Sequence, residues 1–185
     1  MPRPSTALIL RKNPLWTQDL RILDAALIEG NPSHLIVLDV EKIVAYRFQD
    51  NRWQAEQTLP VTHSRAWPRD SRGRLVLRHD RLLDAYLPGV VCQSSAESRL
   101  TLTCRPSDDP WPIGPEQFGV NGFFATTRNY FTGALAPGIG KQATTVPFYS
   151  AAILPREKYT LGLFAGVDGQ IHILDGITDR SAGKL

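Results

Sequence analysis

The stretch from His34 to Tyr46 reads HLIVLDVEKIVAY, and it has the pattern of two short strands joined by a tight turn. The stretch from Arg74 to Tyr86 reads RLVLRHDRLLDAY, and the two align without a gap at a spacing of 40 residues (74 − 34). Aliphatic and β-branched runs separated by charged turn residues are typical of β-hairpins. One hairpin pattern used twice at a fixed spacing indicates a repeat architecture.

Short apolar and alternating runs, interrupted by turn residues about every 8–12 positions, extend over the whole chain and predict an all-β protein. A segment with some helical character, Thr17–Ala26, does not keep a 3.6-residue period, so we expect its second half to be a strand. The predicted strands are Ala7–Leu10, Arg21–Ile28, His34–Asp39, Ile43–Phe48, Trp53–Leu59, Arg74–Arg78, Leu82–Leu87, Val90–Gln93, Arg99–Cys104, Gly122–Ala125, Tyr130–Ala134, Ala143–Val146, Tyr149–Leu154, Thr160–Ala165 and Gln170–Leu174.

The repeat continues toward the C-terminus. Ala25–Ala26 aligns with Ala151–Ala152, and Leu35 aligns with Leu161, at an offset of 126 residues (161 − 35). That offset equals three periods of 42, and a weaker copy, NGFFATTRNYFTGAL, lies between. The markers therefore recur about every 40–44 residues and define four similar units.

A four-stranded antiparallel unit needs about this much chain and cannot bury both of its faces alone, so radial stacking of the units predicts a β-propeller or partial propeller. About four blades of four strands are expected, with the small inner strands at the axis. A β-sandwich and a plain β-meander remain alternatives. The expected blades of this single domain, 1–185, are 21–59, 63–104, 108–147 and 148–185, the last without an outer strand of its own and Ala7–Leu10 as an outer or closing strand.

Two stretches, ILDAALIEGNPSHLIVLDVEKIVAYRFQDNRW and FYSAAILPREKYTLGLFAGVDGQIHILDG, resemble blades of the FG-GAP or VCBS-type β-propellers. Such propellers form the head of integrin α chains and occur in bacterial secreted proteins. The resemblance implies a propeller fold and an extracytoplasmic location. The family's calcium loop is rich in Asp, whereas the turn here offers only Glu29, Gly30 and Asn31. Calcium takes about six to eight oxygen ligands, so no metal site is expected.

Two cysteines, Cys92 and Cys104, lie on the arms of a predicted hairpin with a Ser-rich turn. Facing positions on paired strands allow a disulfide, which is our expectation ahead of two free thiols. A disulfide indicates an extracytoplasmic compartment. The N-terminus of the chain does not have the pattern of a signal peptide.

The composition narrows the classes of partner. The net charge is +3 and the charged fraction is 21%, which is typical of a globular protein. Six arginines lie between Arg65 and Arg81. Such a patch could attract phosphates or acidic glycans, but solvated turn arginines are the interpretation we favour. No aromatic residues alternate with them, so no nucleic acid is expected, and no run is long enough for a membrane span.

No catalytic signature emerges. The stretch PGIGKQATT, Pro137 to Thr145, lacks the first Gly of a phosphate loop, so no nucleotide or other cofactor is expected. The candidate binding residues are Arg128, Asn129 and Tyr130, because exposed aromatic and Arg side chains are enriched at binding hot spots. The alternative, which we favour, is that the strand beginning at Tyr130 has a purely structural role and these residues bind nothing.

These patterns predict a noncatalytic binding or structural module that engages a protein or glycan through loops at one end of the blades. The alternatives are a propeller hydrolase or lyase acting on carbohydrate, with loop carboxylates at the central mouth, and a piece of a larger protein that supplies the remaining blades.

Overall fold

The computed structural model describes residues 14, 16–63, 66–96, 99–113, 120–126, 128–135, 146–155, 160–174 and 179–184. All regular elements in this part of the chain are β-strands, and they form three antiparallel sheets. The all-β prediction is therefore confirmed. The predicted strand Ala7–Leu10 lies outside the described residues. Of the strand predicted at Ala143–Val146, residues 143–145 also lie outside them, and Val146 is not in a strand.

The first sheet contains the hairpin predicted at His34–Tyr46. Its strands, in spatial order, are β1 (Asp24–Ile28), β2 (His34–Leu38), β3 (Lys42–Gln49) and β4 (Arg52–Pro60). The buried carboxylate of Asp39 accepts hydrogen bonds from the backbone N–H groups of Glu41 (2.7 Å) and Lys42 (2.8 Å). The Asp39 side chain thus serves as the acceptor for two backbone N–H groups of the turn. This explains how the turn can be tight without a glycine.

The second sheet has the same order and carries the disulfide. Its strands are β5 (Arg74–Leu77), β6 (Leu83–Leu87), β7 (Val90–Ala96) and β8 (Leu100–Pro106). Cys92 of β7 and Cys104 of β8 are directly opposite in the register and are bonded to each other. The predicted disulfide is confirmed, and it fixes the outer hairpin of this sheet.

The third sheet differs from the expectation of two separate blades, 108–147 and 148–185, because it joins seven strands. In spatial order it runs from β15 through β14, β13, β12, β11 and β10 to β9. The strands are β9 (Trp111–Pro112), β10 (Val120–Ala125), β11 (Tyr130–Leu135), β12 (Phe148–Pro155), β13 (Thr160–Gly166), β14 (Gln170–Leu174) and β15 (Asp179–Lys184). A single pair, Phe131 with Phe148, links its two halves, and their rings stack at 5.5 Å.

Two strands of the third sheet were not predicted from the sequence. β15 pairs with β14, so the expectation that the last unit lacks an outer strand of its own is wrong. Its sequence, DRSAGK, has no β-branched residue, and the pairing rather than the propensity makes it a strand. β9 has only two residues, one of them a proline, and is below the length at which a pattern can be read.

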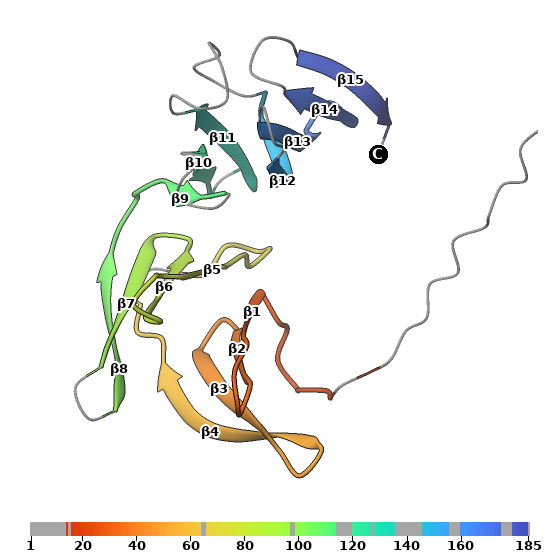
Figure 1. The fold of residues 1–185 in the computed structure, drawn as a ribbon. Coiled ribbons are helices and arrows are strands. Elements are labelled where there is room, and N and C mark those ends of the chain that lie inside the picture. The colour runs from red at the N-terminus through yellow and green to blue at the C-terminus, as the bar shows by residue number, and fades with distance from the viewer. Residues whose placement is uncertain are drawn as a thin grey trace, which may run out of the picture.

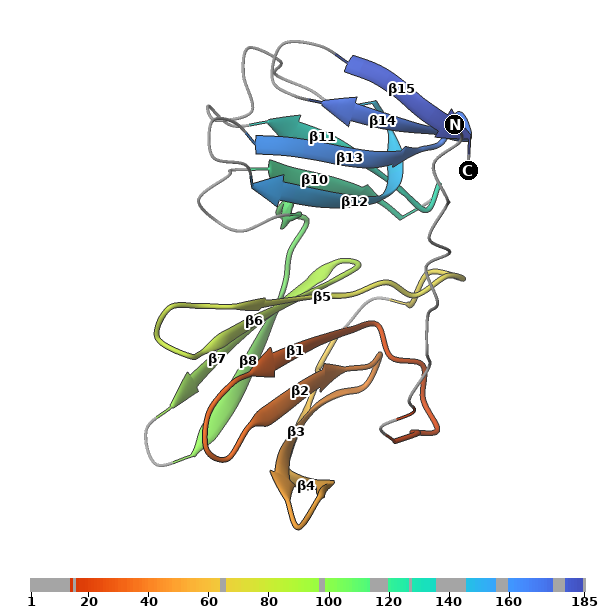
Figure 2. The same cartoon turned by 45° about the vertical axis from the view of Figure 1, so that its right-hand side comes forward.

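The sheets follow one another along an open arc, with β4, β8 and β15 on the outside and β1, β5 and β12 toward the inside (Figure 1). In the view of Figure 2, the third sheet lies apart from the first two sheets. Two hydrogen bonds tie equivalent strands of the first and second sheets together. Asp24 of β1 accepts from the backbone N–H of Leu75 in β5, and Gln57 of β4 donates to the carbonyl of Leu100 in β8.

The phase of the repeat differs from the 40-residue spacing. β5 begins 50 residues after β1 (74 − 24), and β6 begins 49 residues after β2 (83 − 34). The alignment of Leu35 with Leu75 therefore matches the second strand of one sheet, β2, with the first strand of the next, β5. Such a match arises because the hairpins of both sheets have the same alternation of apolar and polar residues. By contrast, Leu35 and Leu161 do occupy the second strands of β1–β4 and β12–β15.

Two hydrophobic cores hold the arc together. The first lies between the facing sides of β1–β4 and β5–β8 and includes Leu38, Ile43, Leu83 and Leu87. The second is aromatic and surrounds Phe148, which is fully buried. The ring of Phe148 contacts Phe131 (5.5 Å between centroids) and Phe164 (5.1 Å), and Phe131 in turn contacts Trp111 and Phe124 at 5.0–5.3 Å.

Candidate functional site

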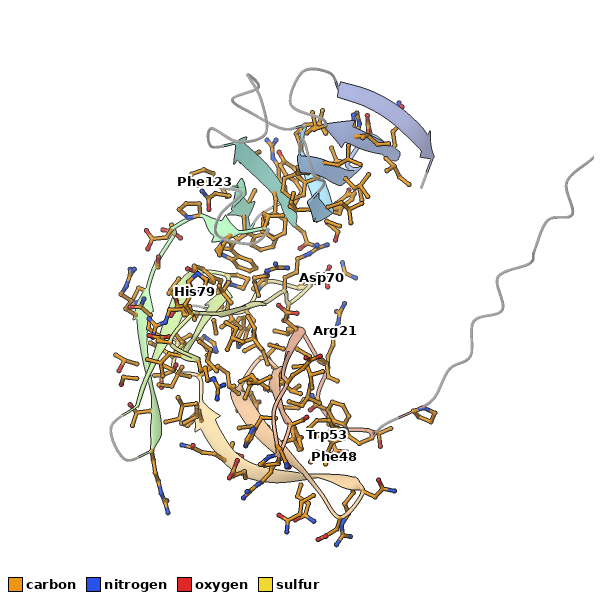
Figure 3. The ribbon with its side chains drawn as sticks, in the orientation of Figure 1. Arg21, Phe48, Trp53, Asp70, His79 and Phe123 are labelled. Carbon is orange, nitrogen blue, oxygen red and sulfur yellow. A yellow bond between two sulfur atoms is a disulfide. The ribbon has the colours of Figure 1, made fainter. Side chains whose placement is uncertain are left out.

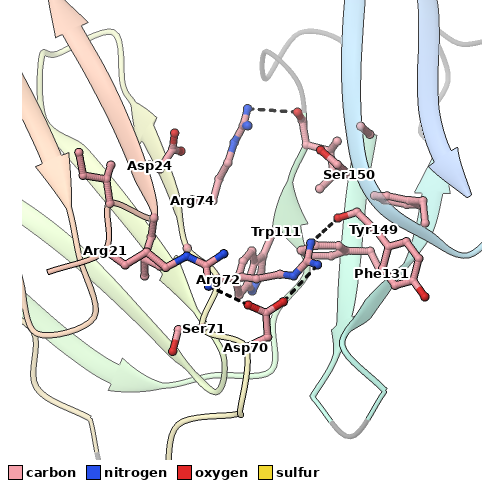
Figure 4. A pocket seen from close by; sticks show the side chains of 16 residues that line it. Arg21, Asp24, Asp70, Ser71, Arg72, Arg74, Trp111, Phe131, Tyr149 and Ser150 are labelled. Carbon is pink, nitrogen blue, oxygen red and sulfur yellow. Dashed lines mark hydrogen bonds and ion pairs between the residues drawn. The ribbon is translucent and has the colours of Figure 1, made fainter. Parts of the chain in front are cut away.

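A pocket of about 360 Å³ lies where the inner ends of the three sheets approach one another. Its polar side chains come from β1 and the segment before it, from β5 and the loop before it, and from β12, which are far apart in the sequence (Figure 4). Arg21 and Asp70 point into the open side of the arc (Figure 3). The pocket is lined by Arg21, Ile22, Leu23, Asp24, Asp70, Ser71, Arg72, Gly73, Arg74, Trp111, Ile113, Phe131, Phe148, Tyr149, Ser150 and Ala151. Its volume is that of a small-ligand site.

The loop before β5 supplies two of the five charged side chains of the pocket, Asp70 and Arg72. Its last residue, Gly73, packs so closely that a Cβ there would lie 2.7 Å from Cδ2 of Leu38 and 3.0 Å from Cβ of Leu23. Only glycine lets the backbone come this close to the first core. The close approach fixes the path of the loop and so directs Asp70 and Arg72 toward the third sheet.

Asp70 is the centre of a polar network. Its Oδ2 accepts a hydrogen bond from Nδ2 of Asn129 (2.7 Å), and its Oδ1 accepts one from Nη1 of Arg21 (3.0 Å). The bond from Asn129 is the main cause that lowers the pKa of Asp70, and the charges of Arg21 and Arg72 lower it further. Asp70 is therefore held as a carboxylate.

Arg72 connects the second sheet to both halves of the third. Its Nε donates to Oδ1 of Asn129 (3.2 Å), and its Nη1 donates to the backbone carbonyl of Tyr149 in β12. The third guanidinium nitrogen, Nη2, lies 3.6 Å from Oδ2 of Asp70. A planar group with five donors suits such a junction, since one side chain can satisfy acceptors on three segments.

The predicted binding residues Arg128, Asn129 and Tyr130 lie in the turn between β10 and β11 and at the start of β11. Asn129 has a positive φ of 56°, which asparagine tolerates better than most residues, and its amide bridges Asp70 and Arg72. Arg128 instead donates to the hydroxyl of Tyr130 (3.2 Å). None of the three predicted residues lines the pocket itself, but Asn129 bonds to Asp70 and Arg72, which do.

Arg74 stands apart from the network. Its Nη2 donates to the backbone carbonyl of Ile113 (3.1 Å), and its Nε is buried without a hydrogen-bond partner. Asp24 lines the same pocket, but its oxygens accept from the backbone N–H groups of Ala25 (2.9 Å) and Leu75 (2.7 Å). Within the described residues, Arg74 forms no ion pair with a carboxylate.

The opposite wall of the pocket is aromatic. Trp111, Phe131 and Phe148 are buried and form a rigid surface with few polar groups. Tyr149 is 41% exposed at the rim, beside the hydroxyl-bearing Ser150. The pocket therefore offers a ligand an apolar wall, hydroxyl groups, two carboxylates and cationic donors.

Sequence reasoning found only part of this site. The pattern of the arginines between Arg65 and Arg81 favours solvated turn residues. The side chain of Arg72 is only 26% exposed, because it lies between sheets. A signal was present in the stretch RDSRGR, Arg69 to Arg74, where paired charges surround a glycine directly before a strand. Without the register of the sheets, nothing places Asn129 or Tyr149 beside it.

Other site chemistries find no support in the described part of the chain. In those residues no group of three or more His, Cys, Asp or Glu side chains is arranged to hold a metal ion. No helix among them is long and apolar enough to cross a membrane. No protein-family model, no curated protein and no solved structure matches the chain.

Proposed function

We propose that the chain is a noncatalytic binding module with a propeller-like arrangement of sheets. In this proposal it recognises a protein or glycan at the pocket between the inner ends of the sheets. The observation that supports it best is the Asp70–Arg72–Asn129 network. These three side chains tie the second and third sheets together around a cavity and hold its shape before any ligand arrives. Preorganisation of this kind lowers the entropic cost of binding.

The propeller arrangement is supported by the order of the sheets. The first two each run from an inner first strand to an outer fourth strand, and they contact one another through equivalent strands. The resemblance of two segments to FG-GAP or VCBS-type blades supports the same interpretation. The Cys92–Cys104 disulfide supports an extracytoplasmic location, where such bonds persist.

The carboxylates of the pocket favour binding over catalysis. A hydrolase or lyase needs a general acid with a raised pKa near the bond to be cleaved. The pKa of Asp70 is lowered instead, and Asp24 accepts two backbone hydrogen bonds. No histidine is among the residues that line the pocket. Both carboxylates act here as structural acceptors.

A contact with further blades is supported by the second face of β12–β14. On this face Leu154 pairs with Leu161 and Leu163 pairs with Ile173, and Leu154 is 40% exposed. None of these four side chains belongs to either core of the described residues. Sheets with two apolar faces are normally covered on both. In this proposal another sheet of a larger protein covers them.

Blocking the pocket tests the proposed function. The protein, produced under oxidising conditions, is screened against immobilised glycan and peptide panels. A large side chain at the half-buried loop residue Ser71, introduced as Ser71→Trp, fills the pocket without removing a hydrogen bond shown for the wild type. Thr62→Trp, on an exposed loop outside the pocket, is the matched control. We expect at least one ligand class that Thr62→Trp retains and Ser71→Trp loses; equal binding by both variants, or no binder at all, contradicts the proposal.

A further inference from the structure

The pocket carries an unbalanced positive charge. Three arginines and two aspartates line it, which leaves one excess positive charge (3 − 2). Asp70 is shared by Arg21 and Arg72, so these three groups form one cluster. Arg74 keeps its charge with a single backbone carbonyl as hydrogen-bond acceptor. A cation that is partly removed from water gains strongly from an anionic partner.

We propose that the pocket binds an anionic sugar, with the carboxylate of the sugar on Arg74. This inference rests on the proposed binding function and assigns its ligand class. A guanidinium presents parallel N–H donors that match the two oxygens of a carboxylate. Arg74 has donors to spare at its two terminal nitrogens, since the bond to Ile113 uses only one of their four N–H groups.

The remaining wall favours a sugar over an acidic peptide. Each oxygen of Asp24 accepts one backbone hydrogen bond and retains capacity for a second, which suits a sugar hydroxyl as donor. Ser71 and Ser150 add hydroxyl groups that both donate and accept. The exposed ring of Tyr149 at the rim can cover the C–H face of a sugar ring. A sugar ring carries several hydroxyl donors beside its carboxylate, whereas an ionised acidic side chain carries none.

The size of the pocket sets the extent of the ligand. A volume of about 360 Å³ is near the lower end of the range for small-ligand sites, so one terminal sugar residue fills it. The rest of a glycan would extend into the open side of the arc, toward which Arg21 points (Figure 3). Arg21 is 71% exposed and is placed to meet further negative charge there.

The test compares three probes by calorimetry: an oligosaccharide ending in glucuronate, its counterpart ending in glucose, and hexaglutamate. The wild type is expected to bind the glucuronate probe and to bind the other two at least tenfold more weakly. Arg74→Gln should weaken glucuronate binding roughly tenfold to a hundredfold, the range for losing a hydrogen bond between charged groups. Arg52→Gln, an exposed arginine on β4 outside the pocket, removes the same charge and should bind as the wild type does.

The outcomes separate this inference from the proposed function. Equal binding of the glucuronate and glucose probes overturns the anionic sugar and leaves a binding module. Preference for hexaglutamate assigns the pocket to acidic peptides and overturns the sugar. If Arg74→Gln is not folded by circular dichroism, Arg74→Lys replaces it: lysine keeps the charge but loses the paired donors, and an unchanged affinity in that variant overturns the proposal. Wild-type protein that binds none of these probes, but binds another ligand that Ser71→Trp loses, overturns the sugar alone.

Discussion

The carboxylate of Asp24 in β1 accepts a hydrogen bond from the backbone N–H of Leu75 in β5, at 2.7 Å between Oδ2 and N. This bond joins the inner strands of two separate sheets across 51 residues of sequence. It is formed at the edge of each sheet, where a backbone N–H would otherwise have no ladder partner. One side chain thus sets the distance between the first and second sheets at the border of the pocket.

Removing this carboxylate should weaken the contact between the sheets. Asp24→Ala leaves the part-buried N–H of Leu75 without its acceptor, and we expect the free energy of unfolding to fall by about 1–3 kcal/mol. Urea denaturation measures the change. Glu29→Ala removes an exposed carboxylate next to the same strand and should change stability by less than about 0.5 kcal/mol. Equal effects of the two substitutions would show that the Asp24–Leu75 bond contributes nothing specific.

Asn129 should matter through its side-chain bonds rather than through its backbone. Asn129→Ala removes the bonds to Asp70 and Arg72 and also places alanine at a positive φ of 56°. Asn51→Ala is the matched control, because Asn51 has a φ of 64° on an exposed turn. We expect Asn129→Ala to lower the melting temperature further than Asn51→Ala does, by an amount equivalent to about 1–2 kcal/mol. Identical shifts would assign the whole effect to the backbone.

The stability of the protein should decrease in acid, in part because of Asp70. Hydrogen bonds from Asn129 and Arg21 lower its pKa below the ordinary value of 3.8. A group whose pKa is lower in the folded state contributes stability above its unfolded pKa, and this stability is lost as the pH falls through the folded pKa. Below about pH 4, Asp70→Asn should therefore lose less stability than the wild type. Parallel pH profiles of thermal unfolding for the two proteins would refute this role.

Two other carboxylates contribute to the same acid dependence. Arg105 lowers the pKa of Asp109, and His172 lowers the pKa of Asp168 by a hydrogen bond at 3.0 Å. Asp70→Asn should for this reason reduce the pH dependence without abolishing it. The contrast between that variant and Asp168→Asn measures how much of the dependence arises at the pocket.

The Cys92–Cys104 disulfide should stabilise the second sheet. It closes a loop with a sequence separation of 12, for which loop-closure entropy predicts about 3 kcal/mol. Reduction with dithiothreitol should lower the urea midpoint of the wild type. The double variant Cys92→Ala/Cys104→Ala supplies the control, since its midpoint should already be low and should not respond to reductant. A wild-type midpoint that is the same with and without reductant would contradict this role.

Much of the strand pattern could be predicted from local sequence. Thirteen of the fifteen predicted segments overlap strands of the structure, since alternation and turn residues act over a few positions. The phase of the repeat could not be predicted in the same way. The hairpins at His34 and Arg74 look alike, yet one spans the second and third strands of its sheet and the other the first and second. Only pairing between distant strands distinguishes these two cases.

The candidate site was still less accessible from the sequence. The sequence points to Asn129 through its neighbours Arg128 and Tyr130, whereas its side chain bonds to Asp70 and Arg72, more than fifty positions away. The polar groups of this pocket come from different sheets and the segments before them, so no short motif contains them. The arginine-rich loop was visible, but its role depends on which sheets face it.

The central claim is that the loop of the second sheet and the turn of the third act as one unit around the pocket. A double-mutant cycle with Arg72→Gln and Asn129→Ala, read from the free energy of unfolding in urea, measures this most directly. Residues that share a hydrogen-bond network typically show coupling energies of about 0.5–3 kcal/mol, and we predict a value in that range. Strictly additive effects of the two substitutions would contradict the account.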